Sequence, residues 1–304
     1  VFTGGWDQKS TLAVFGQDVI WLMLSAFIIT AGMEKSGFAN RLALYVLSKF
    51  GTTAKKTLIA LMVVNLLLAF VVPSTTARAA LMLPICLMIL KVYHAIPGES
   101  NFGKQVMIQQ IHSNNISTSG ILTATAPQIL AVSYITSLSG FDVTWSQWFI
   151  AGMPIAILTL ITSMIFGHFL YKPEMTTAPL EKNEQGTSLS LKEQYQALGK
   201  ITNKEIKALV IFFLTIFLWA SDGYQIALFG FQISLVMVAV LSATLFFMPY
   251  IGLINWKESN IPWDLMIFSC GAYAVGLSLD SSGAASFLLN KAFGQFDLEA
   301  MSPF

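Results

Sequence analysis

The stretch VVPSTTARAALMLPI, residues 71–85, places polar side chains in the middle of a long apolar run. Four of them fall within five positions: Ser74, Thr75, Thr76 and Arg78. Pro73 stands directly before them, and a proline cannot donate the backbone hydrogen bond that a helix interior needs. The pattern predicts that the apolar segment 57–91 folds as two helices joined by a tip at residues 73–76.

The chain as a whole has the composition of a membrane protein. It is 55% hydrophobic and 11% charged, whereas soluble domains carry about 25% charged residues. A net charge of +1 gives no reason to expect a nucleic-acid partner. The histidines lack metal-ligand spacing, and no nucleophile–base pair is visible, so we expect neither an enzyme nor a metal or other cofactor. The sequence predicts an all-α polytopic membrane protein.

Apolar runs near the length that crosses a bilayer recur along the chain. The candidate segments are 18–34, 57–72, 77–91, 105–117 with 128–138, 148–171, 206–220, 225–248 and 262–279. The segment 105–138 is interrupted by STSGILTATAPQ, where Gly120 and Pro127 weaken helix, so we expect a broken helix. Residues 36–51 and 282–296 mix apolar and basic side chains, which is typical of amphipathic helices at a membrane surface.

Lysine and arginine predict the orientation of the chain, because they gather in cytoplasmic loops. They crowd residues 35–56 and the polar region 171–205. With both on the cytoplasmic side, the hairpin 57–91 enters and leaves from that side and is re-entrant. Two capping-box patterns, at Ser190 with Glu193 and at Thr202 with Glu205, predict helix starts in the polar region.

An internal repeat supports a transporter architecture. Residues 18–51 align without gaps to 264–297, with seven identities, and the two segments are predicted to cross in opposite directions. Inverted repeats are typical of transporters that bind substrate near the midplane. We therefore divide the chain into a first repeat (1–170), a cytoplasmic connector (171–205) and the first part of a second repeat (206–304). The second hairpin would fall beyond Phe304, so the second repeat is expected to be truncated.

The hairpin tip is the first candidate site. Helix ends inside a membrane leave backbone groups that need partners, and a helix starting near Ala77 points its positive end at the tip. The hydroxyls of Ser74, Thr75 and Thr76 add donors, and Arg78 adds positive charge, which together predict an anion-binding cradle. The alternative is that the hydroxyls only cap the helix and that Arg78 reaches cytoplasmic water.

The interruption in segment 105–138 is the second candidate site. Its candidate substrate-binding residues are Thr118, Ser119, Thr123, Thr125 and Pro127. Gly120 permits close backbone approach, and exposed carbonyls near it would suit a cation. The alternative is that these hydroxyls make ordinary interhelical hydrogen bonds.

Both motifs resemble those of the divalent-anion/sodium symporter (DASS) family. STTARAALMLPI is similar to the first hairpin of that family, and TSGILTATAPQ looks like the broken helix of its citrate/succinate and oxoglutarate/malate exchangers. The resemblance implies a homodimer in a plasma (inner) membrane, with a transport domain that moves like an elevator. It also implies that tip and broken helix bind substrate carboxylates and, in symporters, Na⁺.

One departure bears on the coupling ion. The family has Asn where this sequence has Thr75, and an Asn carbonyl is a better cation ligand than a hydroxyl. We expect a secondary carrier for dicarboxylates such as succinate, malate or oxoglutarate, working as a sodium-independent exchanger. Sodium symport, with a cation at Ser74, Thr75 and Gly120, stays an alternative. Further alternatives are a sulfate or other inorganic-anion permease and a non-transporting fragment or membrane scaffold.

Overall fold

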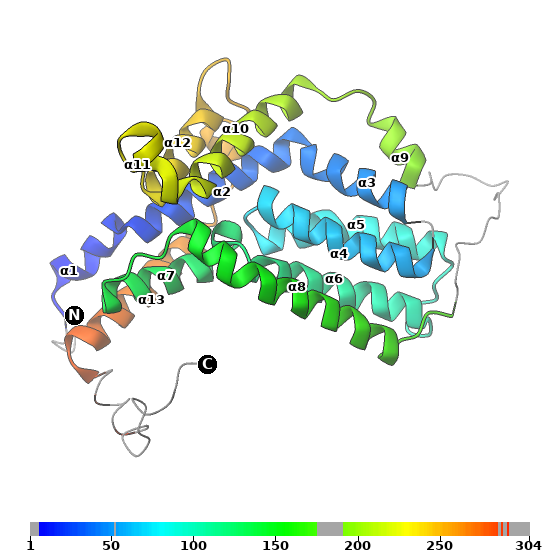
Figure 1. The fold of residues 1–304 in the computed structure, drawn as a ribbon, viewed down its shortest axis with the longest axis horizontal. Helices are drawn as coiled ribbons and strands as arrows, with labels where there is room; N and C mark the ends of the chain where they lie inside the picture. The colour runs from blue at the N-terminus through cyan, green and yellow to red at the C-terminus, as the bar shows by residue number, and fades with distance from the viewer. Residues whose placement is uncertain (1–5, 52, 175–190, 285–286, 288–290, 292–304) are drawn as a thin grey trace. The chain divides into compact units, whose positions relative to one another are not determined.

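The computed structural model describes residues 6–51, 53–174 and 191–284, together with Phe287 and Lys291. Over these residues it contains helices and no β-strand (Figure 1). The chain forms two compact units, residues 1–24 with 262–304 and residues 25–261. The predicted all-α architecture is confirmed.

The first unit contains α1 (Gln8–Ala13), the 3₁₀ helix η1 (Val14–Gly16), the start of α2 (Asp18–Ser36) and α13 (Trp263–Ser281). The second unit contains the rest of α2 and then α3 (Phe38–Phe50), α4 (Ala54–Val71), α5 (Thr75–Val92), α6 (Asn101–Ser119), η2 (Leu122–Ala124), α7 (Ala126–Ser139), α8 (Trp145–Leu170), α9 (Leu191–Ala197), α10 (Asn203–Ala220), η3 (Asp222–Tyr224), α11 (Gln225–Phe229), α12 (Leu235–Phe247) and η4 (Trp256–Glu258).

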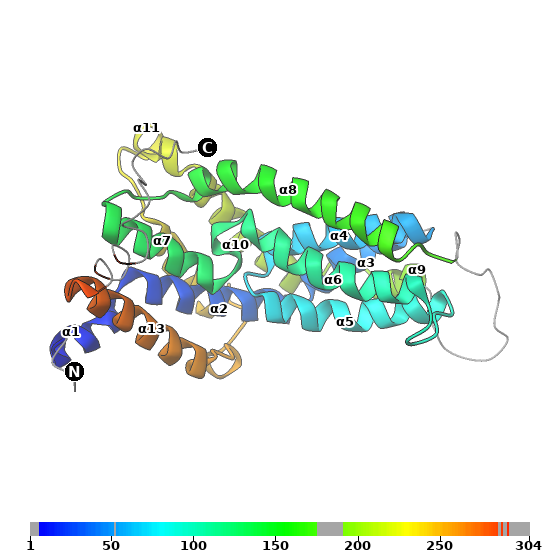
Figure 2. The same ribbon diagram turned by 90° about the horizontal axis from the view of Figure 1, so that it is seen from below.

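The predicted hairpin is present as α4 and α5, joined by residues 72–74 (Figure 1). Ser74 begins α5 as its N-cap, with its side chain accepting from the backbone N–H of Ala77. Both arms lie against α6, and α8 covers α6 on another side, as Figure 2 shows from below. Whether the hairpin re-enters on one side of a bilayer stays a prediction.

The predicted broken helix is confirmed as α6 and α7, separated by η2. The backbone leaves helical geometry at Ile121 and is fully extended at Thr125, where φ is −160°. Pro127 lies in the first turn of α7, where its missing N–H costs no helical hydrogen bond. The chain therefore restarts a helix at the place where the sequence pattern placed the interruption.

Small residues bring the end of α6 close to α8. A Cβ added to Gly152 would lie 2.9 Å from the carbonyl oxygen of Ser119, and one added to Gly120 would lie 3.1 Å from the Cα of Met153. Such contacts leave no room for a side chain. Glycine is thus required at both positions by close packing rather than by a left-handed backbone.

Among the described residues, four helices are long and apolar enough to cross a membrane: α2, α4, α5 and α8. The expected span 225–248 is instead divided. Gly230 is left-handed (φ +78°) and ends α11 before α12 begins. The buried side chain of Gln225 holds this turn, because it donates to the carbonyl of Leu218 and accepts from the N–H of Ile233, both at 2.7 Å.

The basic segment 36–51 forms α3, whose buried face packs on α4 and α9. Its position at a membrane surface stays a prediction. The capping box between Thr202 and Glu205 is confirmed at the start of α10. Residues 175–190, with Ser190 of the other box, and most of the predicted surface helix 282–296 lie outside the described residues. The division into repeats and connector therefore stays a prediction.

Candidate site at the hairpin tip and the broken helix

The three hydroxyls of the tip have different surroundings. The Ser74 hydroxyl accepts from the N–H of Ala77 at 3.3 Å, so it caps α5 as the alternative interpretation had it. Thr75 is half-buried and Thr76 is exposed. Neither hydroxyl makes a hydrogen bond within the described part of the chain. The tip thus offers two uncommitted hydroxyls beside the start of a helix.

Arg78 does not reach water, because its side chain is completely buried. Its Nε donates to Oδ1 of Asn114 at 3.0 Å, and its Nη2 donates to the Asn114 carbonyl at 3.2 Å. Asn114 in turn donates through Nδ2 to the carbonyl of Thr75 at 2.9 Å. The interpretation in which Arg78 reaches cytoplasmic water is therefore wrong: the guanidinium joins the tip to α6.

The contacts of Arg78 are all with neutral groups. Its Nη1 has no hydrogen-bond partner, and the two ion pairs between described residues, Lys35 with Glu258 and Arg41 with Glu205, do not involve it. A buried charge is costly unless it is paired with an opposite charge and fully hydrogen-bonded. Among the described residues, the buried guanidinium of Arg78 therefore has no carboxylate partner.

A second polar joint ties the other arm of the hairpin to α6. Asn65 of α4 donates to Oε1 of Gln110 at 2.8 Å, and Gln110 donates back to Oδ1 of Asn65 at 3.1 Å. Both side chains are buried. Gln110 and Asn114 are one helical turn apart, so both joints use one face of α6. Sequence analysis missed this pair, although Asn65 is an isolated amide in the apolar run 57–72 and was a detectable signal.

Three of the hydroxyls in the broken helix already have partners. Thr118 donates to the carbonyl of Asn115, and Ser119 donates to that of Ile116 at 2.7 Å. Thr123 accepts from the indole N–H of Trp145 at 3.3 Å. These hydrogen bonds are local or interhelical, as expected if the hydroxyls serve packing and not substrate binding. Thr118 and Ser119 have thereby donated their single proton and can only accept further hydrogen bonds, whereas Thr123 keeps its proton and can still donate one.

The remaining predicted residues lie at the start of α7. Thr125 is the N-cap residue but makes no side-chain capping bond, and it is half-buried. Pro127 is exposed. Thr118 follows Asn114 by four residues, which is about one turn or about 6 Å along α6. Because Asn114 contacts the tip, the structure brings the tip and the start of the break to neighbouring positions on one helix.

Two of the carbonyls at the end of α6 already accept hydrogen bonds from side chains. Gln128 donates to the carbonyl of Thr118 at 2.8 Å, and the Trp148 indole donates to that of Ser119 at 3.0 Å. Gly120 lies against Met153 of α8. One groove on the described surface lies between α3 and α4 and another between α5 and α6, and none of the predicted site residues lines either.

An all-helical fold with several apolar helices of bilayer length defines a multi-pass integral membrane protein. Residues 2–303 match the family described as the sodium:sulfate symporter transmembrane region. The chain therefore belongs to this family, which confirms the resemblance to divalent-anion/sodium symporters.

Several curated relatives match along most of the chain. It is 30% identical to a membrane protein of Cupriavidus necator, over 94% of this chain and 53% of the relative. It is 26% identical to a citrate/succinate antiporter of Escherichia coli, over 90% and 55% respectively. It is also 26% identical to a sodium-dependent dicarboxylate transporter of Staphylococcus saprophyticus, over 93% and 56%. The chain thus spans about half the length of the relatives it matches.

Proposed function

We propose that the protein carries small dicarboxylates, of the succinate, malate and oxoglutarate type, across the plasma membrane. The observation that carries this proposal is the buried guanidinium of Arg78, which has neutral partners and an unpaired Nη1. A substrate carboxylate at the tip would supply the missing negative charge. The names of two relatives, a citrate/succinate antiporter and a dicarboxylate transporter, support the substrate class.

In this proposal the roles of the tip residues differ. The hydroxyls of Thr75 and Thr76 donate to the substrate, because neither has another partner in the described structure. Arg78 stabilises the bound anion from behind the tip, where low polarity strengthens its field. The residues of the break, from Thr118 to Pro127, complete this half of the site. Ser74 caps α5 and contributes less to ligand binding than Thr75 and Thr76.

We further propose exchange without sodium. Thr75 replaces a better cation ligand, and the carbonyls of Thr118 and Ser119 are already hydrogen-bonded. Arg78 would then provide part of the positive charge that Na⁺ supplies in symporters. Movement of a rigid transport domain and assembly as a homodimer are proposed from the family resemblance.

The test uses protein expressed from the complete open reading frame in sealed proteoliposomes. Labelled succinate uptake is measured with and without internal dicarboxylate, each with and without a sodium gradient. Uptake that needs internal dicarboxylate and ignores sodium is the expected result. Sodium-driven uptake into empty vesicles would show a symporter and contradict the exchange proposal.

Inorganic sulfate is the second candidate substrate, because hydroxyls and a helix start at the tip suit any divalent oxyanion. The description of the matching family also names sulfate. Competition separates the two. Excess sulfate should leave labelled succinate uptake unchanged, and inhibition of labelled sulfate uptake by succinate, with no succinate uptake, would favour the sulfate permease.

A further inference from the structure

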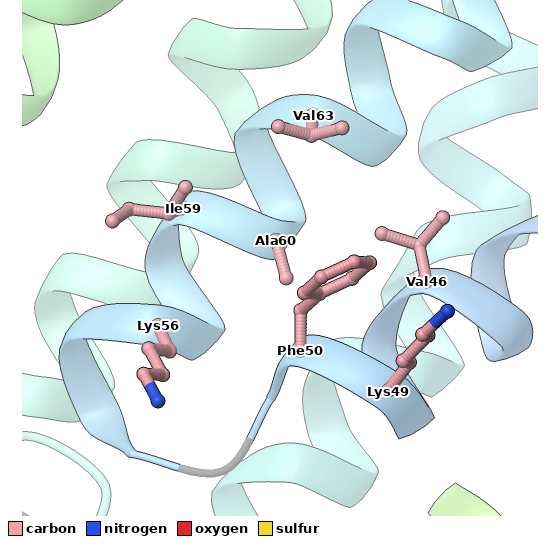
Figure 3. Close-up of a pocket in the computed structure, with 7 residues that line it drawn as sticks. All are labelled: Val46, Lys49, Phe50, Lys56, Ile59, Ala60 and Val63. Carbon is pink, nitrogen blue, oxygen red and sulfur yellow. The ribbon is translucent and has the colours of Figure 1, made fainter.

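A groove of about 430 Å³ lies between α3 and α4, away from the proposed substrate site (Figure 3). Its walls are apolar and include Val46, Phe50, Ile59 and Val63. Lys49 and Lys56 also line it, from α3 and α4 respectively, on opposite sides of Phe50 in Figure 3. We call this feature the α3–α4 groove. It combines a basic rim with an apolar floor.

Among the described residues, no acidic side chain forms an ion pair with the lysines at the rim. No acidic residue occurs between Glu34 and Glu99, a segment that holds the rim residues Lys49 and Lys56 and the neighbouring Lys55. All three lysines are exposed, and none forms an ion pair within the described residues. Two of them lie in the first turn of α4, which has no acidic residue to offset the positive end of the helix. The rim is therefore complementary to an anion.

Aromatic rings hold one of the lysines at the rim. The Nζ of Lys49 lies 5.6 Å from the centre of the Tyr45 ring and 5.8 Å from that of Phe50. It also donates to the Tyr45 hydroxyl at 3.4 Å. Cation–π contacts of this kind restrict the side chain without neutralising its charge. The ammonium is thus fixed beside the groove.

An exposed apolar stripe continues from the rim along α4. Ile59, Val63 and Leu67 are spaced four residues apart, so they share one face, and each is 37% exposed. From Ile59 to Leu67 the stripe is about 12 Å long. Positive charge stands at one end and hydrocarbon extends from it. This is the arrangement of a phospholipid, with an anionic headgroup at one end and acyl chains at the other.

We propose that the α3–α4 groove binds an anionic phospholipid, with its phosphate between Lys49 and Lys56 and an acyl chain along the stripe. A small soluble anion would occupy only the rim and leave the apolar surface uncovered. A zwitterionic lipid would cover the stripe and leave the charge of the lysines uncompensated. An anionic lipid would cover the apolar stripe and also compensate the charge of the lysines.

The test is native mass spectrometry on the complete protein, titrated with phosphatidylglycerol, with phosphatidylcholine of the same acyl chains, or with glycerol phosphate. The groove variant is Lys49→Gln/Lys56→Gln. The matched control, Lys192→Gln/Lys200→Gln, removes the same charge from two exposed lysines outside the groove. Each cation near a membrane surface contributes about 1 kcal/mol, so the groove variant, which loses two cations, should bind phosphatidylglycerol about 30-fold more weakly.

The expected result is selective binding of phosphatidylglycerol that the groove variant loses and the control keeps. Equal loss in both variants would show general charge attraction and overturn the proposal. Equal binding of phosphatidylcholine, or displacement of lipid by glycerol phosphate, would overturn it as well. The melting temperatures of all variants should match that of the wild type, because the substituted lysines are exposed.

Discussion

Arg78 and Asn114 are joined across two helices, with Nε of the guanidinium donating to Oδ1 of the amide at 3.0 Å. The same amide donates to the carbonyl of Thr75. Asn114 therefore positions both the charge and the backbone of the tip. Four predictions test this joint, the packing of α6 against α8, and a contact at the start of α6.

Arg78→Gln should reduce dicarboxylate uptake by about 10- to 100-fold, because a hydrogen bond to a charged group contributes about 1.5–3 kcal/mol. The yield of folded protein by size-exclusion chromatography should fall much less. Lys91→Gln is the control, since it removes an exposed positive charge from the other end of α5. Equal losses of uptake and folded yield would contradict a role of Arg78 in transport.

Asn114→Ala should lower the melting temperature in detergent by about 5 °C, because Nε of the buried Arg78 loses its side-chain acceptor and only the backbone carbonyl remains. The double variant Arg78→Met/Asn114→Leu should be more stable than Asn114→Ala. In the double variant no buried charge is left unpaired. If the double variant is less stable than the single one, the buried charge of Arg78 is not costly to the fold.

Gly152→Ala should destabilise the protein by about 1–3 kcal/mol, because the added Cβ would meet the Ser119 carbonyl oxygen at 2.9 Å. Gly271→Ala is the matched control in α13, where an added Cβ meets nothing within 4 Å. That control should be neutral or slightly stabilising, as alanine favours helix. Similar melting temperatures for both variants would show that α6 and α8 separate easily.

Glu174 should link residues 100–102 to the region after α8 in a pH-dependent way. Its carboxylate accepts from the backbone N–H groups of Asn101 and Phe102 at the start of α6 and from the Ser100 hydroxyl. Slight burial raises the pKa of Glu174, but these hydrogen bonds outweigh it and hold the pKa below the ordinary 4.5. A lowered pKa stabilises the fold above pH 4.5 and stops doing so as the pH falls through the folded value.

Glu174→Gln should therefore lower the melting temperature slightly at pH 7, and the difference from wild type should shrink below pH 4.5. Glu99→Gln serves as the control, because it alters a nearby exposed carboxylate that makes no hydrogen bond in the described structure. A difference that stays constant from pH 7 to pH 3.5 would show that the carboxylate charge is irrelevant.

The hairpin and the broken helix were predictable because their signals are local. Pro73 and Pro127 act on their own backbone neighbourhood, whatever the rest of the fold does. The division between α11 and α12 was missed although Gly230 marks it, since an apolar run reads as continuous when periodicity is the only guide.

The partners of the site residues were not predictable. Whether Arg78 reaches water or turns inward depends on where Asn114 lies, and that is a property of how α5 packs on α6. Likewise, the hydroxyl of Thr123 meets the indole of Trp145, which is distant in sequence. Sequence alone shows that polar groups are buried, but their pairing requires the tertiary structure.

The two joints on α6 have a mechanical consequence. A single contact between helices acts as a pivot, about which a hairpin can still swivel. Here Gln110 secures one arm and Asn114 secures the other, one turn apart on the same helix. With two attachment points the hairpin cannot rotate about either one without breaking the other. A displacement of α6 that leaves both joints intact therefore moves the tip with it.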